Sequence, residues 1–290
     1  MSGNLHGINR LKLGLLKMSS GAVIIANNTP EIEYLRMARV AARLVTKHLN
    51  IPVALITDNE VSYLEFEKVI VVPRGNNNTR TTMMGSTHQT MNWYNLGRTD
   101  VYDLTPWDRT LVIDADFFVK TDALKSHMSA SFDFGIAKDI HLPNDGKTNF
   151  TFVSKTRIPH MWATVMIFNK SNQAESIFAM AKHVIKHYKT YAKIYDFEER
   201  YIRNDFAFSI ACHLLGGYGM YDFGLRNYSL TNVYFHNNIN QIRANGEFVI
   251  EYSKIYKNEP RIYVSKLGIS DTHFLNKISL MEHIEELEQL

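Results

Sequence analysis

The feature that most constrains the fold of this chain is a strand–helix–strand pattern near its beginning. Residues 21–26 and 52–57 are apolar runs with the length of buried strands. Between them, apolar residues recur at helical spacing as far as Leu49, and Thr29 and Pro30 suit the start of that helix. Further apolar runs follow at 69–72, 111–113, 133–137 and 161–169. We therefore predict an α/β fold with a mixed, mostly parallel central sheet flanked by helices.

The length and composition of the chain are typical of one large domain. It has 290 residues, of which 45% are hydrophobic, enough to bury a sizeable core. We predict an N-terminal extension over residues 1–20, followed by two halves of a single domain over 21–120 and 121–290. The only cysteine, Cys212, lies in an apolar stretch, which excludes an internal disulfide and predicts a buried thiol.

Two aspartates, Asp114 and Asp116, follow the apolar run at 111–113. Side chains alternate along a strand, so these two carboxylates leave the same face of the chain. Such a pair of hard oxygen ligands suits Mg²⁺ or Mn²⁺, which proteins commonly share with the phosphates of a substrate. The alternative is that one carboxylate caps the next helix and the other is solvated.

Three further segments contain residue types suited to binding anions or metals. A polar loop is predicted over 73–80, and a helix that carries Arg98 is predicted over 91–102. Arg98 either binds a diphosphate with its guanidinium group or is a solvated surface residue. Asn204 and Asp205 lie where a helix begins, so Asp205 is either a helix cap or a catalytic carboxylate. Near the end of the chain, His273 and Lys277 are four residues apart, and an imidazole beside two carboxylates is a plausible manganese ligand set.

Taken in order, these features resemble the GT-A-fold glycosyltransferases, most closely the glycogenin-like family 8. The chain also resembles glycosyltransferase-like proteins associated with bacteriophages. The resemblance implies Mn²⁺, or Mg²⁺, bound by Asp114, Asp116 and His273. It also implies a donor diphosphate held by Asp114, Arg98 and Lys277, a uracil and ribose received at Ala26 and Asn27, and Asn204 and Asp205 near the anomeric carbon. Asn276 and Ile278 depart from the family, which has a glycine and a Lys-Pro-Trp tail after its histidine.

The resemblance implies transfer of a sugar from a nucleoside diphosphate sugar, specifically a UDP-sugar, to a hydroxyl group. Retention of the anomeric configuration is favoured, with Asp205 stabilising the reacting carbon or orienting the acceptor. In an inverting reaction the same carboxylate would act as the general base.

The acceptor is either a glycan or a hydroxymethylated or already glycosylated pyrimidine in phage DNA. The net charge of +3 favours anionic partners without requiring nucleic acid, and no apolar run has the length of a membrane span. We therefore expect a cytoplasmic protein, in the host cytoplasm if it is encoded by a phage. A DNA groove would use the basic residues Arg74, Arg80, Lys155, Arg157 and His160, with Trp162 assisting base flipping.

Two other classes of function remain open. The strand before Asp114 also resembles the nucleophile strand of haloacid-dehalogenase phosphatases, in which the first aspartate is phosphorylated. Phe118 and the long region before the aspartates depart from that pattern. A noncatalytic protein that binds nucleotides or nucleic acid is the second alternative.

Overall fold

The central sheet of the computed structural model has six strands in the order β3-β2-β1-β6-β13-β8. The structure describes residues 18–74, 78–84, 87–93, 95–143, 146–147, 152–197 and 202–290. Strands β3 (Lys68–Val71), β2 (Val53–Thr57), β1 (Ser20–Ile25) and β6 (Arg109–Asp114) are parallel, whereas β13 (Trp162–Asn169) is antiparallel to both β6 and β8 (Phe134–Ala137). The predicted mixed, mostly parallel sheet is confirmed.

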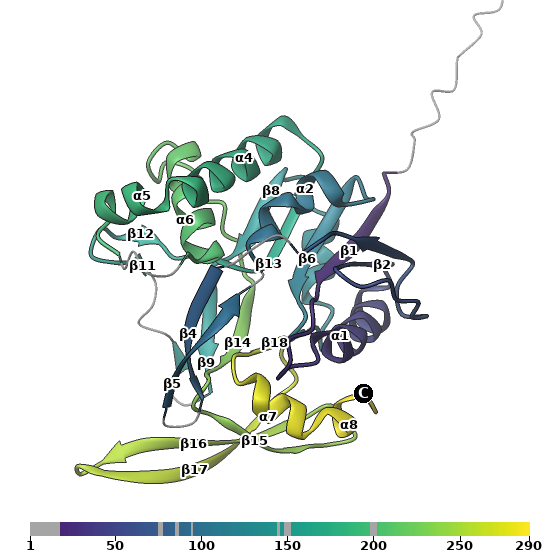
Figure 1. The fold of residues 1–290 in the computed structure, drawn as a ribbon, viewed down its shortest axis with the longest axis vertical. Coiled ribbons are helices and arrows are strands. Elements are labelled where there is room, and N and C mark those ends of the chain that lie inside the picture. Colours follow the sequence, from purple (N-terminus) through teal and green to yellow (C-terminus); the bar gives the residue numbers. More distant parts are fainter. Residues whose placement is uncertain are drawn as a thin grey trace, which may run out of the picture.

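Helices cover both faces of this sheet (Figure 1). Helix α1 (Tyr34–Leu49) shares a core with Ala22 and Ile24 of β1, whereas Val23 belongs to the core under α4 (Asn172–Lys186) and α6 (Asn204–Leu215). This division follows from the alternation of side chains along a strand. Cys212 is buried in the second core, as predicted.

A second sheet has five strands in the order β10-β9-β14-β18-β7. Its strands β9 (Asp139–Leu142), β14 (Ser229–Val233) and β18 (Thr272–Phe274) are parallel, with β10 (Gly146–Lys147) and β7 (Phe117–Phe118) antiparallel at the edges. Strand β7 directly follows Asp116, and its Phe117 pairs with His273 of β18. This sheet therefore joins the end of the chain to the aspartate pair.

The last third of the chain adds an antiparallel meander before β18 and two short helices after it. Strands β15 (Asn238–Ile242), β16 (Phe248–Tyr256) and β17 (Glu259–Leu267) form the meander, and the β16–β17 hairpin projects from the body (Figure 1). Helices α7 (Lys277–Glu282) and α8 (Ile284–Leu287) follow. The remaining elements are β4 (Asn78–Met84), β5 (Thr87–Trp93), η1 (Asn95–Asp100), α2 (Val101–Leu104), α3 (Ala123–Met128), β11 (Phe152–Val153), β12 (Ile158–Pro159) and α5 (Tyr188–Ile194).

Several local predictions were wrong. Helix α1 begins at Tyr34 rather than at Pro30, because Thr29 Oγ1 accepts the amide of Ile32 and Asn28 Oδ1 accepts the amide of Leu35 in a preceding turn. The predicted loop over 73–80 and the predicted helix over 91–102 overlap the β4–β5 hairpin at their ends, and helical structure starts only at η1. Of the predicted N-terminal extension, residues 1–17 lie outside the described residues, and Ser20 already belongs to β1.

Candidate functional site

Asp114, Asp116 and His273 form one cluster of potential metal ligands. One ligand atom from each residue lies within 4.8 Å of the others. His273 Nε2 is 3.8 Å from Asp114 Oδ2 and 3.5 Å from Asp116 Oδ2. Asp116 and His273 are buried, and Asp114 is partly exposed. The sequence-predicted metal ligands are therefore brought together by the fold.

The two sheets determine this arrangement. Asp114 is the last residue of β6, at the carboxyl end of the parallel strands, and Ile25 at the end of β1 pairs with it. After Asp116 the chain enters β7, which is antiparallel to β18. The amide of Phe274 donates to the carbonyl of Asp116 at 3.1 Å, so His273 is fixed beside the aspartates by backbone pairing.

Asn232 orients the His273 ring, and this residue was missed from the sequence. It faces His273 across the β14–β18 pair, and its Oδ1 lies 3.0 Å from His273 Nδ1. Both side chains are buried. The amide oxygen can only accept a hydrogen bond, which places a proton on Nδ1 and the lone pair of the neutral ring on Nε2. Burial also lowers the pKa of His273, which favours the neutral form.

Arg98 is a buried cation beside the cluster. Its guanidinium donates to Asp114 Oδ1 and to the carbonyl oxygen of Ala163 on β13. Burial lowers the pKa of Arg98 to about 10, so the side chain still carries its charge at neutral pH. The sequence-based alternative of a surface arginine is thereby excluded, since Arg98 is only 2% exposed.

Lys277, at the first turn of α7, is ion-paired with Asp116 Oδ2. Its Nζ also donates to the carbonyl of Phe274 at 2.9 Å. Burial raises the pKa of the Asp116 carboxyl, but Lys277 and His273 outweigh this effect and hold that pKa far below its ordinary value. Asp116 is therefore a carboxylate at neutral pH.

Asp205 lies at the beginning of α6 and is linked to Arg98 through one residue of β13. Its Oδ1 accepts the amide of Ala163 at 3.0 Å, while the carbonyl of the same Ala163 accepts from Arg98. Burial raises the pKa of Asp205, but the charge of Arg203, whose guanidinium lies 3.2 Å away, the charges of His160 and Arg98 and the bond from the Ala163 amide together outweigh it and lower the pKa overall. The neighbouring Asn204 is buried.

Ala26 and Asn27 follow β1 at the same edge of the sheet as Asp114. Ala26 is buried, and Asn27 Oδ1 accepts the amide of Asp58 at 2.9 Å. This bond ties the end of β1 to the loop after β2. Oδ1 of Asn27 therefore holds the protein backbone at the edge of the sheet where a nucleoside was predicted to bind.

The residues predicted for a DNA groove do not form a common exposed surface where the structure describes their side chains. Arg74 is ion-paired with Asp58 at 2.5 Å and donates to the carbonyl of Asn28 at 2.7 Å. His160 is buried, with its ring centroid 4.6 Å from that of Trp162. Lys155 and Arg157 are exposed, and the side chain of Arg80 lies outside the described part of the chain.

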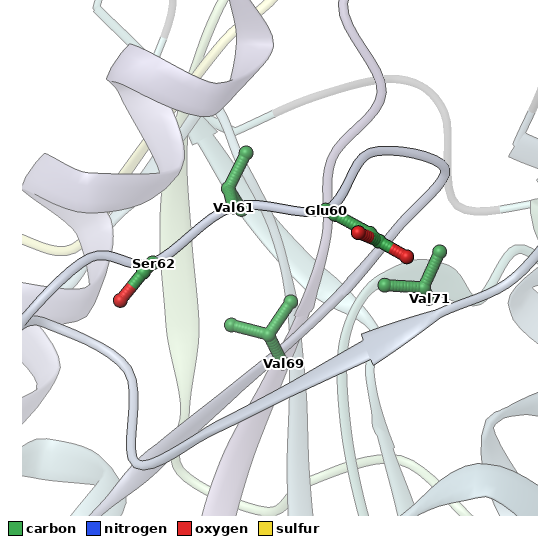
Figure 2. A pocket seen from close by; sticks show the side chains of 5 residues that line it. All are labelled: Glu60, Val61, Ser62, Val69 and Val71. Carbon is green, nitrogen blue, oxygen red and sulfur yellow. The ribbon is translucent and has the colours of Figure 1, made fainter.

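A separate surface pocket lies beside the edge strand β3 (Figure 2). Figure 2 shows its lining of Glu60, Val61, Ser62, Val69 and Val71. None of the five residues that line this pocket belongs to the candidate site.

In the part of the chain that the structure describes, no helix has both the length and the apolar character that a membrane span requires.

The residues of the cluster fit a divalent cation. The two carboxylates supply hard, anionic oxygen ligands, the neutral imidazole supplies Nε2, and the buried Asp116 is ionised. Arg98 and Lys277 add positive charge at the rim of the same cluster. The arrangement combines ligands for a metal with cations suited to phosphate oxygens.

No protein-family model matches the chain, and no curated protein matches it either. Among solved structures, it is similar to galactosyltransferase LgtC in complex with donor and acceptor sugar analogs, with a TM-score of 0.46, 13% identity and coverage of 92% of this chain and 94% of that one. It is also similar to glycosyltransferase GlyE of Streptococcus pneumoniae TIGR4 (TM-score 0.37, 10% identity, coverage 72% and 46%). A third is mouse xyloside xylosyltransferase 1 (TM-score 0.40, 14% identity, coverage 66% and 81%). The chain thus spans less than half the length of GlyE.

Proposed function

We propose that this protein is a metal-dependent glycosyltransferase that moves a sugar from a nucleoside diphosphate sugar, a UDP-sugar, to a hydroxyl acceptor. The observation that carries this proposal is the cluster of Asp114, Asp116 and His273, with ligand atoms within 4.8 Å of one another, flanked by Arg98 and Lys277. Such a set of anionic ligands and adjacent cations suits a metal-bound diphosphate. The order of motifs along the sequence, which resembles family 8, supports the same function.

The cation would be Mn²⁺ or Mg²⁺, held by Asp114, Asp116 and His273. When bound, it supplies positive charge that stabilises the diphosphate as a leaving group. Arg98 is fixed in the protein interior and Lys277 is partly exposed. These two residues add charge that favours breaking the bond between the anomeric carbon and the diphosphate oxygen.

Asp205 would act near the anomeric carbon, with Asn204 beside it at the start of α6. Because the pKa of Asp205 is lowered, its carboxylate is a weak base. This property favours a role in stabilising positive charge or orienting the acceptor over removal of the acceptor's proton. The resemblance to family 8, rather than this property, favours a retaining reaction over an inverting one.

The site draws on both predicted halves of the domain. Arg98, Asp114 and Asp116 come from residues 21–120, and Asp205, His273 and Lys277 come from residues 121–290. We propose that the first half also receives the nucleoside near Ala26 and Asn27. The second half would receive the acceptor beside Asp205.

We propose a carbohydrate hydroxyl as the acceptor rather than a modified base in DNA. Arg74 is held by Asp58 and His160 is buried, so these two residues are poorly placed for contacts with a phosphate backbone. The exposed charges Lys155 and Arg157 do not by themselves define a nucleic-acid groove.

Calorimetry with UDP, in the presence and absence of Mn²⁺, tests the proposal. We expect UDP binding that depends on Mn²⁺ in the native protein and is lost in Asp116→Ala. A panel of nucleotide sugars incubated with the protein and Mn²⁺ should then show slow hydrolysis of one donor. Absence of metal-dependent UDP binding would overturn the proposal. Release of phosphate from a phosphate monoester, abolished by Asp114→Asn, would instead favour the phosphatase alternative.

A further inference from the structure

We infer that Lys277 is an internal counter-cation of Asp116, which must leave this carboxylate when a divalent cation binds and which then pairs with the diphosphate of the donor. This inference rests on the proposed function and concerns regulation of the same site. Its consequence is that the cation and the diphosphate bind cooperatively.

Lys277 contacts a carboxylate oxygen that faces His273, whereas Arg98 contacts one that does not. Lys277 contacts Asp116 Oδ2, which is also the oxygen 3.5 Å from His273 Nε2. A cation held between Asp116 and His273 would use this oxygen. The ammonium group of Lys277 therefore competes with the cation for the same ligand atom.

Arg98 does not compete in this way. It contacts Oδ1 of Asp114, whereas Oδ2 of the same carboxylate faces His273 at 3.8 Å. Its second bond, to the carbonyl of Ala163, holds the guanidinium in the interior. Arg98 can therefore keep its bonds when a cation binds, and Lys277 is the residue that has to move.

The side chain of Lys277 is suited to such an exchange. It is 18% exposed, compared with 2% for Arg98, and its ammonium is a point charge at the end of a flexible four-carbon stem. A divalent cation on Asp116 would repel it at short range. The anionic oxygens of a diphosphate bound next to the cation provide a new partner close to the old one.

The exchange predicts the sign of the coupling between the two ligands. Without diphosphate, binding of the cation has to break the Lys277–Asp116 ion pair, and the bond from Lys277 to the neutral carbonyl of Phe274 does not supply the lost negative charge. With diphosphate present, the displaced ammonium gains an equivalent partner. Each ligand therefore raises the affinity for the other, and the coupling must be equal in both directions.

Binding of Mn²⁺ to the full chain, measured from the electron paramagnetic resonance signal of free Mn²⁺, tests the inference without turnover. For the native protein we expect saturating UDP to raise the affinity for Mn²⁺ by about tenfold or more, within the usual range of such coupling. In Lys277→Ala and Lys277→Gln, the affinity for Mn²⁺ alone should rise by a similar factor of about ten. In these variants, UDP should then raise the affinity for Mn²⁺ much less than it does in the native protein.

Lys257→Ala provides a matched control, because Lys257 lies in the turn of the exposed β16–β17 hairpin. It should bind Mn²⁺ and UDP as the native protein does. The two Lys277 variants guard against loss of folding, since Gln keeps most of the length of the native side chain at the start of α7.

Lys277 variants that are folded but bind Mn²⁺ alone no more tightly than the native protein would overturn the inference while leaving the proposed function standing. A native protein that binds no Mn²⁺ even with UDP would refute the proposed function itself. The two failures are therefore distinguishable.

Discussion

Oδ1 of Asn232 lies 3.0 Å from Nδ1 of His273, and the two residues face each other in the pairing of β14 with β18. The bond fixes the ring so that Nε2, and not Nδ1, faces the two carboxylates. A metal-binding histidine commonly has such a partner on its second ring nitrogen, and that partner increases the affinity for the metal. Asn232 is thus a positioning residue for the proposed cation site.

We predict that Asn232→Leu weakens Mn²⁺ binding in the presence of UDP by about tenfold or more, because losses of such partners typically have this size. Leucine has the same number and branching of side-chain heavy atoms but cannot accept a hydrogen bond from Nδ1, so the ring loses its fixed orientation. Calorimetry measures the affinity, and Asn172→Leu at an exposed position of α4 is the control. Unchanged Mn²⁺ affinity in a folded Asn232→Leu protein would contradict the assignment.

The candidate metal-binding and basic residues were easier to predict from the sequence than the contacts of Asn232 and Ala163 that hold them in place. Asp114 and Asp116 stand at the end of an apolar strand, and His273 and Lys277 have a recognisable spacing, so residue type, local pattern and the family resemblance were enough to select these four residues as candidates. Asn232 is one of three polar residues in β14, and its role depends on a register between segments 41 residues apart. Ala163 contributes only its backbone groups, which no residue pattern reveals.

The fold shows a similar division between local and long-range information. The first strand–helix–strand unit was predictable because its residues are buried on both faces of the sheet and therefore form continuous apolar runs. The β16–β17 hairpin was not predicted. Beyond its base it is largely exposed, with Ile255 at 74% and Ile262 at 70%, so burial imposes no regular alternation on its sequence.

We predict that Arg98→Met destabilises the protein by about 3 kcal/mol, as expected when one partner of a buried ion pair is removed. The substitution leaves Asp114 Oδ1 and the carbonyl of Ala163 without the guanidinium. Urea denaturation measures the loss, and Mn²⁺ with UDP should restore part of it by supplying positive charge beside Asp114. Equal stability of the variant and the native protein without ligands would show that Arg98 does not stabilise this carboxylate.

Lys120 gives a prediction about pH. Its Nζ donates to the carbonyl of Gly246 at 3.2 Å and lies 4.6 Å from the centroid of the Phe248 ring. Burial lowers its pKa from 10.5 to about 8. The unfolded chain therefore binds a proton more readily than the folded protein between these values, and stability due to this residue rises with pH across that window.

We expect the free energy of unfolding of the native protein to rise relative to that of Lys120→Met between pH 8 and pH 10, by up to about 3 kcal/mol. Below pH 8 the difference should be constant, because Lys120 is then protonated in both states. Urea denaturation at several pH values provides the measurement. Parallel pH profiles for the two proteins would contradict the lowered pKa.

Gly21 in β1 is a position where the side chain of Trp107 leaves no room for a Cβ atom. A Cβ atom there would lie 2.4 Å from Cε2 of Trp107, and Trp107 is buried and therefore cannot move freely. We predict that Gly21→Ala destabilises the protein by about 1–3 kcal/mol, the usual effect of overpacking a core. Gly268→Ala is the matched control, since a Cβ at Gly268 would meet nothing within 4 Å. Thermal and urea denaturation should show a loss in the first variant alone. Equal stability of the two variants would mean that Trp107 can shift to accept the methyl group.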